Sequence, residues 1–224
     1  LILAMAHALQ HRNIALDLWC GAGEILQNYN SRARASVMSA LGRHGVAVHL
    51  DCRVAAVEDA ALVLDDGSRH FYDDLFWCTG AAASPWVAES GLATDERGFL
   101  KIRDTLHSVD DENVFAAGDI AVQIYHPRPT AGVYAVRQGP VLAQNLRARL
   151  LGRSLKEHHP QQSFLSLVSL GDRQAAADKS IFSATGRWVW RWKDRIDREF
   201  MARFENLPAM PTGGSRDVLP AALE

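Results

Sequence analysis

Apolar and polar positions along the first part of the chain predict helices and strands in alternation. Residues 1–12 have the composition of a helix, and the apolar run 14–19 that follows is typical of a buried parallel strand. A second helix is expected over 31–44, and a second apolar strand over 46–49. This order predicts part of a βαβ unit, the building block of parallel sheets.

Turn and cap residues indicate where these elements end. Ser31 is expected to cap the second helix at its N-terminus, and Gly45 is placed for its C-terminal cap. The run Asp-Asp-Gly at 65–67 is a strong hairpin signal. The short strands expected around this turn form a meander and lead into a further strand; they cover 54–57, 61–64, 70–72 and 74–78.

Beyond residue 80 the pattern changes, because irregular, partly acidic stretches separate the apolar runs. The elements expected here are strands over 98–102 and 113–117, a long amphipathic helix over 130–151, two or three short strands within 161–182 and a charged, Trp-rich helix over 187–205. The mixture of helices and strands along the whole chain predicts an α/β fold.

Composition and charge exclude several classes of protein. Hydrophobic residues make up 48% and charged residues 22%, which is an ordinary globular balance and not that of a disordered chain, a collagen or a coiled coil. The 24 Lys and Arg are balanced by 26 Asp and Glu, so we expect no nucleic-acid partner. The longest mostly apolar stretch, 75–88, is interrupted by polar residues and is shorter than the ~20 residues that span a bilayer.

Cysteine usage favours a reducing compartment. The three cysteines are scattered and form no C-x-x-C pair, so a disulfide scaffold is not expected. We therefore expect a cytoplasmic protein.

The segment 113–121, Asn-Val-Phe-Ala-Ala-Gly-Asp-Ile-Ala, carries the clearest chemical signal. Gly118 lets the backbone approach a ligand, and the Asp119 carboxylate can accept hydrogen bonds from the hydroxyls of a sugar alcohol or a ribose. Because Gly-Asp is common in turns, a plain turn is the alternative on these residues alone. Two further pieces stand in order around it, Cys-Thr-Gly at 78–80 and Thr-Ala-Gly at 130–132, where a helix is expected to begin.

These three pieces together resemble the pyridine nucleotide-disulfide oxidoreductase superfamily, flavoproteins with two dinucleotide-binding domains. The resemblance implies a Thr-Gly turn that leaves the NAD(P)H domain, an Asp that holds the ribitol–pyrophosphate region of FAD, and a helix whose N-terminus points at the flavin. Such an N-terminus carries unpaired N–H groups and partial positive charge, which suit the negative charge of a reduced flavin. The cofactor-binding residues that it implies are Thr79, Gly80, Gly118, Asp119, Ala131 and Gly132.

Two later segments narrow the resemblance. Residues 131–139, Ala-Gly-Val-Tyr-Ala-Val-Arg-Gln-Gly, and 190–201, which include Trp-Lys-Asp-Arg-Ile-Asp, are similar to type II NADH dehydrogenase-like flavoproteins of the kind fused to selenide, water dikinase. The resemblance covers nearly the whole chain but only the C-terminal part of the family's length. It implies FAD and NAD(P)H as cofactors, hydride transfer from nicotinamide to flavin, and then electron transfer to a quinone or a selenium or sulfur species.

The resemblance also implies the organisation of the chain. The fold class is α/β, part of a two-dinucleotide-binding-domain flavoprotein in which Rossmann-like units carry a β-meander, plus a small α+β C-terminal domain. Because the chain opens inside a helix without a cap, we expect the intact protein to continue upstream. The expected parts are an NAD(P)H-binding domain without its first strand and Gly-rich loop at 1–80, the C-terminal half of an FAD-binding domain at 81–152, a C-terminal domain at 153–206 and a tail at 207–224.

A Gly-rich phosphate loop is missing from the sequence, since no G-x-G-x-x-G run occurs in the 224 residues. A dinucleotide is held chiefly at such a loop and the helix N-terminus that follows it. Gly-Ala-Gly-Glu at 21–24 comes after the second strand of the unit, so we interpret it as a turn. We expect this chain alone to bind FAD poorly, and an inert fragment or an association module is the alternative to an oxidoreductase.

Histidine spacing gives no metal signal. His7 and His11 have the i, i+4 spacing of a zinc pair but lack the Glu of H-E-x-x-H and a third ligand, so we interpret them as ordinary surface or packed histidines. His158 and His159 lack the acidic partner and the redox Cys pair of disulfide reductases, and we interpret them as part of a loop. We expect no metal.

The helix expected over 187–205 has two interpretations. Its large apolar residues recur at spacing four, which suits either a membrane-surface helix that gives a quinone access to the flavin or a helix packed on its own domain. Four acidic residues among six basic ones favour packing, with Trp192, Ile196 and Phe200 facing protein. The expected partner is a small-molecule electron acceptor, with peripheral membrane contact through 187–205 and a homo-oligomer both left open.

Overall fold

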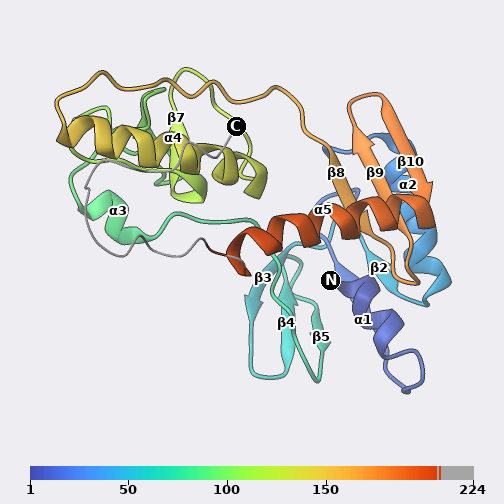
Figure 1. Ribbon diagram of the computed structural model, residues 1–224. Coiled ribbons are helices and arrows are strands. Elements are labelled where there is room, and N and C mark those ends of the chain that lie inside the picture. The colour runs from blue at the N-terminus through green and yellow to red at the C-terminus, as the bar shows by residue number, and fades with distance from the viewer. Residues whose placement is uncertain (206, 208–224) are drawn as a thin grey trace. The chain divides into compact units, whose positions relative to one another are not determined.

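The computed structural model describes residues 1–205 and 207 (Figure 1). The described chain divides into two compact units, of which the first combines Leu1–Phe76 with residues 163–205 and the second is Trp77–Gln162. This division does not show which cofactor, if any, each unit binds. The four functional parts expected from the sequence therefore stay a prediction. The expected tail at 207–224 lies outside the described residues, apart from position 207.

The first unit begins with α1 (Ile2–Ala8), β1 (Asp17–Trp19), α2 (Ser31–Arg43) and β2 (Ala47–His49). The strands β1 and β2 pair in parallel, which confirms the predicted βαβ pattern.

The N-cap of α2 lies one residue before the predicted one. The side-chain oxygen of Asn30 accepts a hydrogen bond from the backbone N–H of Ala33 at 3.0 Å, and Ser31 is already helical. The predicted cap, Ser31, is therefore wrong by one residue. Asn and Ser are equally favourable at this position, so their identities alone do not decide between them. Gly45 follows the helix with φ +68°, as expected of a residue beyond a helix C-terminus.

A three-stranded antiparallel meander follows, made of β3 (Val54–Val57), β4 (Ala61–Leu64) and β5 (Arg69–Phe71). Gly67, with φ +82°, closes the predicted hairpin between β4 and β5. The strand predicted over 74–78 is wrong: among the described residues no strand pairs with this segment, and Phe76 and Trp77 are exposed. An apolar run becomes a strand only where a neighbour accepts its backbone hydrogen bonds.

The first unit is completed by a second antiparallel sheet and a long helix. The sheet contains β8 (Ser166–Ser169), β9 (Ala175–Lys179) and β10 (Phe182–Gly186), and α5 (Arg187–Glu205) packs on it through the buried Val189 (Figure 1). This confirms the short strands predicted within 161–182, although β10 continues four residues beyond that range. The predicted bounds of the final helix, 187–205, are also confirmed.

One apolar core joins α1 and α2 to the β1–β2 pair and to the sheet of β8 and β9. Leu3 of α1, Leu41 of α2, Leu170 next to β8 and Ala176 of β9 are all buried in the same cluster. Burying a side chain of the size of leucine stabilises a fold by about 1.5–3 kcal/mol. The cluster therefore holds residues 1–50 and the segment after 163 in one unit although they are far apart in sequence.

The apolar row of α5 is largely exposed, contrary to the expectation that it faces protein. Trp192 and Ile196 are exposed by 38% and 39%, and only Phe200 of the three predicted residues is half-buried. Four residues turn a helix by about 40° more than one full turn, so a row at spacing four winds off the face that contacts the sheet. No helix among residues 1–205 has the length and hydropathy needed to cross a bilayer.

The second unit contains α3 (Pro85–Glu89), β6 (Leu100–Ile102), a 3-10 turn η1 (Gly118–Ile120), β7 (Ala121–Gln123) and α4 (Gly132–Leu150). The strands β6 and β7 pair in parallel, so their carboxyl ends meet at one edge. Ile102 and Leu106 are fully buried, and Val141 and Leu142 of α4 pack against their cluster. The two strands and α4 thus share one core.

The strand predicted over 113–117 is wrong, although its apolar residues are buried or half-buried as expected. This segment makes only an isolated bridge between Phe115 and His107, and the regular strand comes after the Gly-Asp turn, at β7. The hydrophobic pattern predicts that Ala116 faces the core, as it does. It does not reveal that the N–H of Ala116 donates to the carbonyl oxygen of Leu106 across a tight loop.

Candidate functional site

An open hollow lies in the second unit where η1 and β7 meet the start of α4. The residues of its lining that bear on function are Gly118, Asp119, Gln123, His126, Arg128, Ala131 and Gln138.

Gly118 gives the turn a shape that a larger residue would disturb. Its φ is +75°, and a Cβ added there would lie 3.3 Å from the Cβ of Ala135. Its N–H donates a hydrogen bond of 2.6 Å to the side-chain oxygen of Gln138. The glycine thus brings the turn close to α4 and leaves the next residue, Asp119, at the mouth of the hollow.

Two charged side chains at the hollow, Asp119 and Arg128, have polar atoms without a hydrogen-bond partner among the described residues. Asp119 is exposed, and within the described residues its carboxylate accepts no hydrogen bond. Arg128 is half-buried, and among residues 1–205 and 207 its buried Nε finds no acceptor. A carboxylate and a guanidinium in this condition are suited to a ligand that carries both hydroxyls and acceptor oxygens.

The start of α4 adds partial positive charge beside the hollow. Ala131 is its N-cap in an extended conformation, with no side-chain cap and no acidic residue in the first turn. The first N–H groups of a helix have no intrahelical acceptor, so a 19-residue helix offers them and its dipole to an anionic group.

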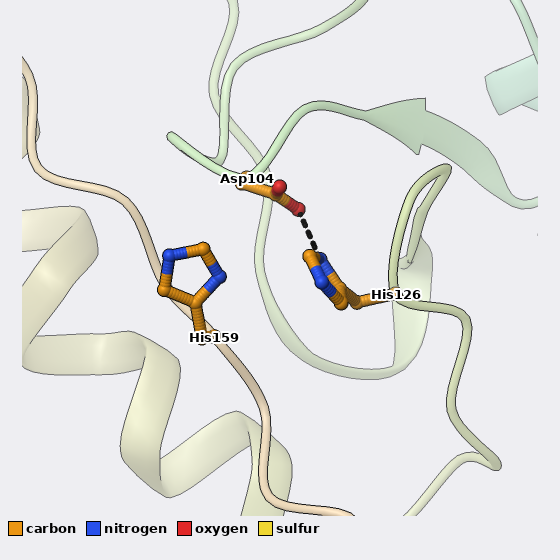
Figure 2. Close-up of side chains that lie close together, drawn as sticks. All are labelled: Asp104, His126 and His159. Carbon is orange, nitrogen blue, oxygen red and sulfur yellow. Dashed lines mark hydrogen bonds and ion pairs between the residues drawn. The ribbon is translucent and has the colours of Figure 1, made fainter.

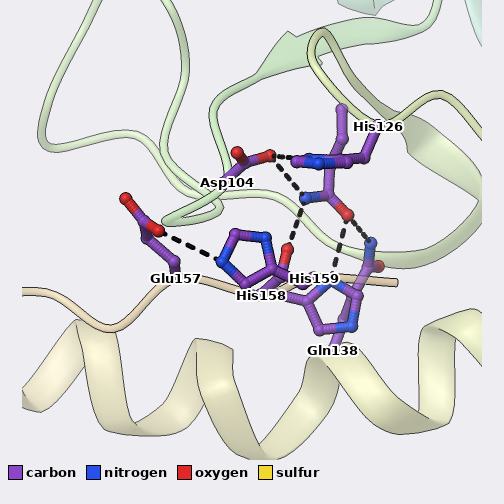
Figure 3. Close-up of polar contacts among 7 residues, drawn as sticks. Asp104, His126, Gln138, Glu157, His158 and His159 are labelled. Carbon is purple, nitrogen blue, oxygen red and sulfur yellow. Dashed lines mark hydrogen bonds and ion pairs between the residues drawn. The ribbon is translucent and has the colours of Figure 1, made fainter. Parts of the chain in front are cut away.

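Below the hollow, polar side chains form a hydrogen-bonded network (Figure 3). Gln138 Nε2 donates to Gln123 Oε1 at 3.4 Å, and His158 Nδ1 donates to the same oxygen at 2.9 Å. Burial lowers the pKa of His158 below its ordinary value, and the neighbouring His159 lowers it further. The imidazole of His158 is therefore neutral near pH 7. Gln123 thus connects Gln138 to a histidine that brings no charge into the network.

The structure brings some of the predicted site residues together and leaves others apart. Gly118, Asp119 and Ala131 line the hollow, and Gly132 opens α4 beside it. Thr79 and Gly80 lie in an exposed irregular segment and are not part of the lining.

Sequence reasoning missed Arg128, Gln123 and the role of Gln138. Gln138 stands in the run 131–139 on which the narrower resemblance rests, two turns inside the expected helix. A buried polar position on an amphipathic helix was the available signal. Nothing in the local sequence marks Gln123 or Arg128.

A hollow at the end of a parallel strand pair and beside an uncapped helix start is the arrangement in which α/β proteins bind nucleotide cofactors. The chain belongs to the pyridine nucleotide-disulphide oxidoreductase family, whose model matches residues 5–139.

Curated relatives agree with this assignment. The internal alternative NAD(P)H-ubiquinone oxidoreductase A1 of Arabidopsis thaliana mitochondria is 27% identical over 171 residues, covering 70% of this chain and 33% of the relative. The type II NADH:quinone oxidoreductase of Haemophilus influenzae is 28% identical over 159 residues, covering 68% and 33%. The chain thus spans about a third of the length of these relatives.

Solved structures show the same fold. The sulfide:quinone oxidoreductase of Aquifex aeolicus superposes with a TM-score of 0.68 at 14% identity, covering 90% of this chain and 53% of that one. A FAD-dependent pyridine nucleotide-disulphide oxidoreductase from Desulfovibrio vulgaris gives a TM-score of 0.60 at 21% identity, covering 78% and 45%. The fold is therefore that of part of a flavoprotein with Rossmann-like units, as predicted.

Proposed function

We propose that this chain supplies the flavin-contacting residues of an FAD-dependent NAD(P)H oxidoreductase. The observation that carries the proposal is the free carboxylate of Asp119 in a hollow beside the uncapped start of α4. FAD, when bound, supplies a ring system that takes a hydride from a nicotinamide and passes the electrons to an acceptor. The two quinone oxidoreductases among the relatives favour a quinone as that acceptor.

The residues around the hollow have distinct roles in this proposal. Asp119 accepts a hydrogen bond from a hydroxyl of the flavin side chain, a charge-assisted contact worth about 1.5–3 kcal/mol. The N–H groups at the start of α4, with Ala131 and Gly132, face negative charge on the ring, and Arg128 donates to an acceptor oxygen. Gly118 keeps the wall of the hollow free of a side chain.

Thr79 and Gly80 keep a separate role in the proposal. They lie outside the hollow in an irregular segment, and as a Thr-Gly connection they would carry the chain between the nicotinamide and flavin domains of the complete enzyme. This role requires no contact between these residues and the flavin.

The test is a titration of the purified chain with FAD and with riboflavin, followed by quenching of flavin fluorescence. Because the 224 residues contain no Gly-rich phosphate loop, the hollow should recognise the flavin end and not the pyrophosphate. We expect a colourless preparation that binds both flavins weakly, with dissociation constants within about tenfold of each other. Failure to bind either flavin would support the alternative, an inert chain or an association module.

We also propose that α5 makes peripheral contact with a membrane. The support is its exposed aromatic and aliphatic side chains, which are Trp188, Trp192, Ile196, Met201 and Phe204. Three of the four acidic residues that favoured packing pair within the helix: Asp194 with Arg198 at 2.8 Å, Glu199 with Arg195 at 2.7 Å, and Asp197 with Lys193. A quinone dissolves in the apolar part of a bilayer, so such a contact would bring the enzyme to its acceptor.

A further inference from the structure

Two histidines and an aspartate from three separate segments converge at one edge of the second unit (Figure 2). Asp104 follows β6, His126 follows β7, and His159 lies in the segment after α4. One nitrogen or oxygen from each side chain lies within 4.8 Å of the other two. Because β6 and β7 are parallel, their carboxyl ends place Asp104 and His126 side by side, with His126 Nδ1 2.9 Å from Asp104 Oδ1.

Outer hydrogen bonds and an ion pair orient two of these side chains, Asp104 and His159 (Figure 3). Gln123 Nε2 donates to Asp104 Oδ1 at 3.1 Å and to the carbonyl of His158 at 2.9 Å, which ties the strand edge to the segment that carries His159. Glu157 pairs with Nε2 of His159 at 3.2 Å. That pair leaves Nδ1 of His159 as the nitrogen available to a further partner, and a carboxylate behind a histidine is the usual outer partner of a metal ligand.

We propose that Asp104, His126 and His159 bind a zinc ion, with a water molecule in the fourth position. Two neutral imidazoles and one carboxylate carry a charge of −1, and imidazole ligands favour zinc over the oxygen-seeking magnesium and calcium. Three protein ligands with an open position are a regular zinc arrangement. The three ligands differ from the proposed flavin contacts Asp119 and Arg128, although His126 also lines the hollow.

The observed spacing is close to what zinc requires. Two ligand atoms that are each about 2.1 Å from a zinc ion lie about 3.4 Å apart at a tetrahedral angle, so the hydrogen bond between His126 and Asp104 opens by about 0.5 Å. His159 closes the remaining distance by rotating, which is unhindered because its side chain is 62% exposed. The ion would replace the hydrogen bond between His126 and Asp104 and join three segments of the unit.

Zinc binding by the chelator-treated full chain tests this proposal. After equilibrium dialysis against zinc, metal analysis should give one tightly bound zinc per chain, and zinc should raise the melting temperature. His159→Ala should abolish tight binding, and Glu157→Ala should weaken it by roughly tenfold to a hundredfold. Since both side chains are exposed, the metal-free variants should melt like the wild type.

His7→Ala is the matched control, because His7 pairs with Asp172 at 2.6 Å in the first unit and lies outside the cluster. It should retain zinc with unchanged affinity. Zinc binding that survives His159→Ala, or that is lost equally in His7→Ala, would overturn the proposal, as would a wild-type chain that retains no zinc. The experiment contains no flavin, so its outcome is independent of the function proposed above.

Discussion

The backbone N–H of Gly118 donates a hydrogen bond of 2.6 Å to the side-chain oxygen of Gln138, twenty residues further along the chain. Gly118 opens η1, and Gln138 lies within α4. This bond therefore holds the Gly-Asp turn against the helix whose N-terminus borders the same hollow. The position of Asp119 and the position of the helix start are coupled through it.

Gly118→Ala should weaken this arrangement. The residue has φ +75°, which costs about 1–2 kcal/mol for a residue with a Cβ, and the new methyl group would press on Ala135. We expect the free energy of unfolding, measured by urea denaturation, to fall by at least that amount. Gly139→Ala, on α4, is the control: outside the backbone of its own helix no atom lies within 4 Å of the added Cβ, so the substitution should raise stability by up to about 1 kcal/mol. Equal effects of the two substitutions would contradict the role given to Gly118.

The cap of α2 can be tested in the same way. Asn30 accepts from the N–H of Ala33 at 3.0 Å and donates to the carbonyl of Phe182 at 3.2 Å. Asn30→Ala should therefore lower the free energy of unfolding by about 0.5–2 kcal/mol. Ser31→Ala, one position later, should change it by less than about 0.5 kcal/mol because Ser31 is not the cap. A larger loss in Ser31→Ala would restore the register predicted from the sequence.

Local patterns predicted the elements whose signals are local. The hairpin at 65–67 needs a Gly with positive φ, and α5 follows a long helical composition, so both are readable from adjacent residues. The segments 74–78 and 113–117 failed because a strand depends on a partner, which hydrophobicity alone does not identify.

The residues of the candidate site also differ in whether the local sequence identifies them. Gly118 and Asp119 are adjacent and carry a recognisable pattern, whereas Gln123 and Gln138 acquire their roles only when β7 and α4 meet. The cluster of Asp104, His126 and His159 is drawn from positions 104 to 159, and these residues have none of the short spacings that mark metal ligands in a sequence. Parallel strands place such residues together, and their pairing was not predictable from the runs themselves.

Membrane contact through α5 predicts a dependence on its exposed tryptophans. Trp192→Glu should weaken co-sedimentation with phosphatidylcholine–phosphatidylglycerol vesicles by at least roughly tenfold, since a large apolar side chain contributes about 1.5–3 kcal/mol on burial. Trp86→Glu is the control, because Trp86 is 58% exposed but lies on α3 in the other unit. Vesicle binding that is insensitive to Trp192→Glu, or equally sensitive to both changes, would count against the contact.

If Asp119 holds the flavin, the Asp119→Ala variant should bind riboflavin more weakly than the wild type. Loss of a charge-assisted hydrogen bond of about 1.5–3 kcal/mol should raise the dissociation constant by about tenfold to a hundredfold. Glu96→Ala removes another exposed carboxylate of the same unit outside the hollow and should leave the constant unchanged. Melting of the flavin-free proteins should show that both variants are folded. An unchanged constant in a folded Asp119→Ala variant would contradict the account.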